Sequence, residues 1–161
     1  MTKILSLIAF VIFIVLPLGI FGAGQIGLLS GNRPLDLGIH DGMLKPPVVD
    51  AWNVVSSYAA RQPHTDYHVI APIAYRGDGQ AAFKKLRDII ERQNGARIVT
   101  DQATYLYAEF QTPTLKFIDD VEFVLDAPAS VIQMRSASRL GLKDFGANRK
   151  RLEAIRAQFN Q

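Results

Sequence analysis

The stretch from Ile4 to Leu29, ILSLIAFVIFIVLPLGIFGAGQIGLL, contains no charged residue. As a helix it would be about 39 Å long, whereas the hydrocarbon core of a bilayer is about 30 Å thick. Pro17 lies inside the stretch, and membrane helices tolerate proline. The pattern therefore predicts that residues 1–29 form a transmembrane segment.

A cleaved signal peptide is the alternative, because Lys3 provides a positive start and Gly22-Ala23-Gly24 a small-residue cleavage site. The apolar run continues past that site to Leu29, which favours an uncleaved signal-anchor. Lys3 places the N-terminus inside by the positive-inside rule. We therefore expect a single-pass protein of the bacterial inner membrane, with residues 30–161 on the periplasmic side.

Composition excludes several classes of site. The chain has no cysteine, so it has no disulfide, thiolate metal site or cysteine nucleophile. A net charge of +3 is too small to indicate a nucleic-acid partner. His64 and His68 straddle the start of a predicted strand, so neither a metal nor another cofactor is predicted. Basic residues gather in 143–158, where they form either a solvated helix face or a contact with anionic headgroups or a phosphate-bearing ligand.

The remaining chain divides into a Pro/Gly-rich tether, 30–66, and a globular domain, 67–161. Within the domain, apolar periodicity predicts strands over 67–75, 96–100, 104–112, 119–126 and 130–138, and helices over 77–95 and 145–159. Four consecutive strands with short connections favour an antiparallel sheet, and two amphipathic helices can cover one of its faces. We expect a two-layer α+β domain of TATA-binding-protein-like or helix-grip type, with a ferredoxin-like variant still open.

The apolar pattern also fixes the register of the last hairpin. If Asp126 pairs with Val131, then Glu122 lies opposite Arg135 on one face, and Phe123 meets Met134 on the other. A slip of one residue would bury the two charges and expose the two apolar side chains. With the neighbouring strand aligned, the helix-free face carries six residues of interest: Tyr105, Tyr107, Glu109, Glu122, Arg135 and Arg139.

Two interpretations of this face remain open. It is either an exposed surface with a cross-strand ion pair, or a ligand site in which tyrosines stack on, and arginines pair with, an anionic or planar ligand. Asp119 and Asp120 point to opposite faces, so they cannot form an acid-base dyad. We expect Asp119 to bond to Ser138 or to the nearby helix end, and Asn148 to satisfy polar groups beneath the sheet. No catalytic residue is predicted.

The motifs DDVEF (119–123), RSASRLG (135–141) and DFGANRKR (144–151) give the chain a family resemblance. Over about residues 48–159 it resembles the bacterial and plastid family catalogued as domain of unknown function 1499. Trp52 and Val54 replace a proline and a cysteine of the family's pattern, which removes any thiol role. The resemblance implies fold and location rather than activity. The residues that match its motifs are Asp119, Asp120, Glu122, Arg135, Ser136, Ser138, Arg139, Asn148 and Arg149.

The sequence favours a membrane-anchored cell-envelope domain that is not an enzyme and binds a ligand or a partner. Candidate partners besides the membrane are an anionic small molecule, a lipid and a membrane protein; the oligomeric state is not specified. One alternative is an enzyme acting on an anionic envelope substrate, with Glu122 or Glu109 as base and Arg135 and Arg139 as anion clamps. A carboxylate of raised pKa in a deep pocket would favour it. The other alternative is a structural subunit of a membrane complex, favoured by an exposed apolar patch beside the anchor.

Overall fold

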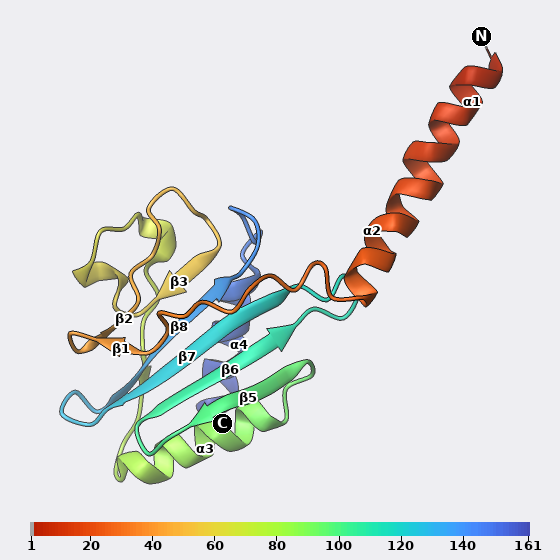
Figure 1. The fold of residues 1–161 in the computed structure, drawn as a ribbon. Helices are drawn as coiled ribbons and strands as arrows, with labels where there is room; N and C mark the ends of the chain where they lie inside the picture. Colours follow the sequence, from red (N-terminus) through yellow and green to blue (C-terminus); the bar gives the residue numbers. More distant parts are fainter. Residues whose placement is uncertain (1) are drawn as a thin grey trace.

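A single long helix begins the structure, a computed structural model that describes residues 2–161 (Figure 1). It consists of α1 (Thr2–Phe10), a π-helical turn η1 (Val11–Val15) and α2 (Leu16–Gln25). Pro17 has no N–H to donate to the preceding turn, which explains why the hydrogen-bond pattern widens there. The 24 residues span about 36 Å, and an 18-residue stretch within them has a mean hydropathy of 3.0. Length and composition thus suit a membrane span, although a signal sequence has the same properties.

The predicted α+β class is confirmed. One antiparallel sheet runs in the order β3-β8-β7-β6-β5, and β4 pairs with the same edge of β8 as β3. Helices α3 (Gly79–Glu91) and α4 (Ala147–Phe159) cover one face, behind the sheet in Figure 1. The strands are β3 (Val54–Ser56), β4 (Ile73–Ala74), β5 (Ala96–Asp101), β6 (Tyr105–Gln111), β7 (Ile118–Asp126) and β8 (Val131–Ser138).

The predicted hairpin register is confirmed, with Asp126 opposite Val131 and Glu122 opposite Arg135. The apolar face of the sheet packs under both helices in one continuous core. The inward side chains of α4 are Leu152, Ile155 and Phe159, as its spacing predicts. From the sheet and α3 the largest contributors are Leu106, Phe110, Phe123, Ile132, Met134, Phe83, Leu86 and Ile90.

The structure differs from the prediction at two places. The strand predicted over 67–75 is reduced to β4, because Pro72 lacks an N–H and residues 66–68 form a short 3-10 helix, η3 (Asp66–His68). The His68 ring satisfies that turn by accepting from the Thr65 N–H, at 2.9 Å. The sheet also gains β3, from within the segment predicted to be a tether. A second 3-10 helix, η2 (Ala59–Arg61), follows β3.

Residues 30–47, here named the strap, run back across the sheet face opposite α3 and α4 (Figure 1). The strap contains a small hairpin of β1 (Ile39–His40) and β2 (Met43–Leu44). Leu44 is buried against Tyr58, Tyr105, Tyr107 and Val124, so a second apolar cluster forms on this face. The chain that leaves the N-terminal helix therefore covers the helix-free face of the sheet.

Candidate functional site

The six candidate ligand-binding residues lie together on the helix-free face, as the strand alternation predicts. They are not on an open surface, however, because the strap covers them. Glu122 is completely buried, and Arg135 is only 5% exposed. Residues Tyr105, Tyr107 and Glu109 are buried as well. Each charge on this face must therefore find its partners within the protein or in a bound molecule.

Glu122 accepts three hydrogen bonds from three parts of the chain. Arg135 Nη1 donates to its Oε2 at 3.0 Å, across the β7–β8 ladder. The Tyr105 hydroxyl donates to Oε1 at 3.0 Å, and the backbone N–H of Gly38 donates to the same oxygen at 2.8 Å. Burial and the neighbouring carboxylate of Glu122 raise the pKa of Tyr105, which keeps its hydroxyl a donor. Glu122 thus joins the strap to the sheet.

A second cluster forms around Arg139. Glu109 and Asp120 lie directly opposite each other on β6 and β7, a like-charge pair that would be destabilising alone. Arg139 Nη2 donates to Glu109 Oε1 at 2.5 Å and to Asp120 Oδ1 at 2.7 Å. The Tyr107 hydroxyl donates to Asp120 Oδ1 at 2.6 Å. The buried guanidinium therefore offsets the repulsion between the two acids.

Glu109 also pairs with arginines from the strap and from β5. Arg33 Nη2 lies 2.6 Å from its Oε1, and Arg97 Nη2 lies 2.5 Å from its Oε2. Burial acts to raise the pKa of Glu109, but the hydrogen bonds from Arg139, Arg97 and Arg33 outweigh it and lower the pKa to about 2. A carboxylate that is this acidic and this fully engaged is a weak base at neutral pH. Its observed role is to hold the strap.

Beside these clusters, a cavity of about 270 Å³ separates the strap from the sheet. The Nε–H of Arg135 has no hydrogen-bond partner within residues 2–161. Three other buried polar atoms are also unpaired in that part of the chain, but they belong to residues that are less buried than Arg135. The cavity lining includes the polar residues Asn32, Lys45, Asn53, Asp120, Arg135 and Arg139, and the apolar residues Pro34, Pro46, Val48, Val54, Ala137 and Leu142.

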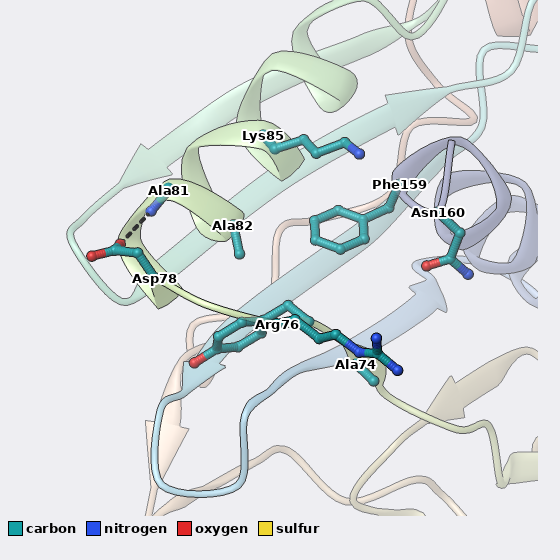
Figure 2. Close-up of a pocket in the computed structure, with 9 residues that line it drawn as sticks. Ala74, Arg76, Asp78, Ala81, Ala82, Lys85, Phe159 and Asn160 are labelled. Atoms are coloured by element: carbon teal, nitrogen blue, oxygen red, sulfur yellow. Dashed lines mark hydrogen bonds between the residues drawn. The ribbon is translucent and has the colours of Figure 1, made fainter.

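A larger cavity, of about 740 Å³, lies on the other side of the molecule, between the start of α3, β4 and the end of α4 (Figure 2). Phe159 and Lys85 project into it, with the Lys85 ammonium 5.2 Å from the ring centroid. Its one carboxylate, Asp78, caps α3 by accepting from the Ala81 N–H at 2.8 Å. Arg76 and Lys85 are exposed. With no buried polar group left unpaired, this cavity is the weaker candidate.

The remaining motif residues connect α4 to the sheet. Asn148 is completely buried; its Nδ2 donates to the Asn53 carbonyl and to Ser138 Oγ, both at 2.9 Å, and its Oδ1 accepts from the Ser136 hydroxyl. Asp119 accepts from Arg151 of α4 at 2.5 Å, rather than from Ser138. Arg149 donates to the backbone carbonyls of Tyr67 and Val69, at 2.6 and 2.9 Å. In the structure these residues join secondary-structure elements, and Ser138 also lines the cavity beside Arg135.

Sequence reasoning missed four members of the site. Arg97 could have been found, because extending the strand alternation to β5 puts it opposite Glu109. Arg33, Gly38 and Lys45 belong to the strap, whose prolines and glycines give no periodic signal. Nothing in the sequence pattern indicates that this segment returns to the sheet.

A family described as "Protein of unknown function (DUF1499)" has a model that matches residues 45–159. The chain belongs to this family. The match to DUF1499 includes the sheet, both covering helices and β3, and it begins at the end of the strap. No curated protein and no solved structure shows significant similarity to this DUF1499 chain.

Proposed function

We propose that this DUF1499 protein is a membrane-anchored module of the cell envelope that binds a small anionic ligand between the strap and the sheet. The observation that carries the proposal is the Arg135 side chain. It is only 5% exposed, it borders the 270 Å³ cavity, and its Nε–H has no partner within residues 2–161. A buried charged donor without a partner is costly, and an anionic group in the cavity would satisfy it.

The balance of charge around the cavity supports an anion. The ion pairs of the two clusters and the strap join five cations to four carboxylates, an excess of one positive charge, whereas Asp41, the other acid of the strap, neither joins these pairs nor lines the cavity. Lys45 pairs with Asp36 at 2.7 Å, a contact that lowers the pKa of Asp36 despite some desolvation. The cations are Arg33, Lys45, Arg97, Arg135 and Arg139, and the carboxylates are Asp36, Glu109, Asp120 and Glu122.

The size and walls of the cavity narrow the ligand class further. A volume of 270 Å³ is near the lower end of the range for small-molecule sites, about 300–1,000 Å³. Pro34, Pro46 and Val48 supply apolar walls. A small molecule with one carboxylate or phosphate and a compact apolar body fits this description. Binding is favoured over catalysis, because the carboxylates of Glu109 and Glu122 each already accept hydrogen bonds from at least three donors.

The N-terminal apolar helix supports a location at the membrane. It is followed directly by the strap, so the ligand site would lie close to the membrane surface. Lys3 lies in the first turn of the helix, and by the positive-inside rule the N-terminus would be in the cytoplasm and residues 30–161 on the periplasmic side.

Native mass spectrometry of the full-length protein, extracted in mild detergent, tests the proposal. We expect the wild type to carry a small anionic molecule as a discrete added mass. The double variant Arg135→Met/Glu122→Gln removes the unpaired donor together with its partner's charge, and should lose that mass. The matched control is Arg92→Met/Glu91→Gln, the same two changes at exposed positions near the end of α3, which should retain it. Equal added mass in all three proteins, or none in the wild type, would contradict the proposal.

A further inference from the structure

The loop between β8 and α4 displays apolar side chains to solvent. Phe145 is 98% exposed and Leu142 is 70% exposed. Trp52, the only tryptophan of the chain, lies beside this loop and is 50% exposed. Phe145 also has a backbone φ of +54°, a region that is unfavourable for a bulky residue. Exposing these apolar groups to water is unfavourable, and exposed apolar patches of this kind mark sites that contact a partner or a membrane.

The loop is held rigidly in this conformation. The Trp52 N–H donates to the Leu142 carbonyl at 2.6 Å, and the Asp144 N–H donates to the Trp52 carbonyl at 3.2 Å. The Asp144 carboxylate accepts from the Tyr67 hydroxyl at 2.5 Å and from the Gly146 N–H at 2.9 Å. These bonds order the residues on both sides of Phe145. The apolar side chains are therefore presented by a preorganised loop.

The end of the membrane helix contacts the β6–β7 loop, which neighbours the β8–α4 loop. The Gln25 side chain donates to the Thr114 carbonyl at 2.8 Å. A Cβ added to Gly24 would be 2.6 Å from the Leu115 carbonyl oxygen, so the helix end rests directly on the β6–β7 loop. A cavity of about 320 Å³ joins that loop to the β8–α4 loop, with Phe117 on one side and Phe145 on the other. The exposed apolar groups thus sit at the end of the domain that carries the anchor.

The charges near this edge are basic. Lys143 lies with its ammonium 5.8 Å from the Trp52 ring centroid, and Lys116 belongs to the β6–β7 loop. Neither lysine forms an ion pair within the described chain. Two of the acids nearby are engaged, Asp144 by Tyr67 and Asp119 by Arg151, whereas Asp50, close to Trp52 in sequence, is exposed. Aromatic and aliphatic side chains interspersed with lysines are the composition of surfaces that enter the headgroup layer of anionic membranes.

We infer that Trp52, Leu142 and Phe145, with Lys116 and Lys143, form a docking edge that inserts into the anionic lipid surface beside the anchor. The inference rests on the proposed membrane anchoring, but not on the anion site at Arg135. Docking would fix the orientation of the domain on the bilayer, with the two loops facing the headgroups.

Trp52 is a built-in probe of this contact. Full-length protein is reconstituted into phosphatidylglycerol vesicles whose acyl chains are brominated near the headgroup. We expect the Trp52 emission to be quenched relative to vesicles without bromine. The variant Leu142→Ser/Phe145→Ser should lose most of the quenching. The variant Lys116→Ser/Lys143→Ser should also lose quenching, and its loss should be larger in vesicles that contain more anionic lipid. The control Ile39→Ser changes an exposed apolar residue of β1, at the end of the sheet away from α2, and should quench like the wild type (Figure 1).

Alkaline carbonate extraction of the same vesicles separates the two claims. If the protein resists extraction but Trp52 stays unquenched, the docking edge does not contact lipid, although the helix still anchors the protein. The exposed apolar side chains would then contact a protein partner. Protein that is released by carbonate would overturn the anchor, and the docking edge with it. Quenching that persists in Leu142→Ser/Phe145→Ser would also contradict the inference.

Discussion

Replacing Arg135 by methionine should destabilise the protein strongly. The substitution keeps most of the apolar stem but removes the positive charge beside Glu122. Glu122 is completely buried and would retain only two donors, the Gly38 N–H and the Tyr105 hydroxyl. Breaking one side of a buried ion pair costs about 3–5 kcal/mol of unfolding free energy, because an uncompensated charge remains. We expect a loss in that range.

The double variant Arg135→Met/Glu122→Gln should recover most of this loss. The glutamine carbonyl oxygen can accept from the same two donors, and the stranded charge is gone. Its stability should lie within about 2 kcal/mol of the wild type. The recovery is the signature of a desolvated pair, since two independent surface changes would simply add.

Urea unfolding of the full-length protein in detergent micelles, followed by Trp52 emission and circular dichroism, measures these differences. Lys84→Met serves as the control, because Lys84 pairs with Asp88 on an exposed helix face, where loss of the pair costs about 0.5 kcal/mol or less. If Arg135→Met behaves like that control, the pair is solvated and the strap does not cover it.

Three further outcomes follow from the structure. Gly95→Ala should destabilise the protein by about 2 kcal/mol or more in thermal unfolding, because Gly95 has a φ of +78° and an added Cβ would lie 2.4 Å from the Gln111 carbonyl oxygen. The control Gly146→Ala has a similar φ of +81° but open space around the added Cβ, so it should cost only about 1 kcal/mol. The pKa of Glu109 is depressed from 4.5 to about 2, so its contribution to folding stability is complete above pH 5 and is lost as the pH falls toward 2. Glu109→Gln should therefore weaken the acid dependence of stability in urea titrations between those pH values, and an unchanged pH profile would argue against the cluster. Phe159→Ala should lower stability by about 3–5 kcal/mol, and an unchanged thermal midpoint would contradict the packing of α4.

The sequence predicts the sheet and its helices well, for an identifiable reason. Most apolar side chains of β6 to β8 fall on one face, so a register shifted by one residue would expose Phe123 and Met134. The Asp78 cap and the inward face of α4 follow from equally local rules. Local periodicity therefore identifies both faces of the sheet and the six residues that line the second one.

The covering of that second face could not be predicted in the same way. The strap reaches Glu109 through Arg33 and Glu122 through the Gly38 N–H, contacts that are 76 and 84 residues apart in sequence. A backbone donor carries no side-chain signature, and the strap's glycines and prolines resemble a flexible linker. The strap decides how the charged face is interpreted, because it buries the Glu122–Arg135 ion pair that would otherwise lie on the surface. The cavity beside Arg135 exists only because the strap lies there.

The central claim is that the Arg135 Nε–H is free to bind a small anion in the strap cavity. Side-chain ¹⁵N NMR of the full-length protein in micelles, titrated with inorganic phosphate and separately with acetate, observes that group directly. The Arg135 Nε–H resonance should shift and saturate, whereas that of Arg139, whose Nε already donates to Asp120 at 3.0 Å, should not move. Equal shifts at both arginines, or no saturable shift at Arg135 with either anion, would contradict the account.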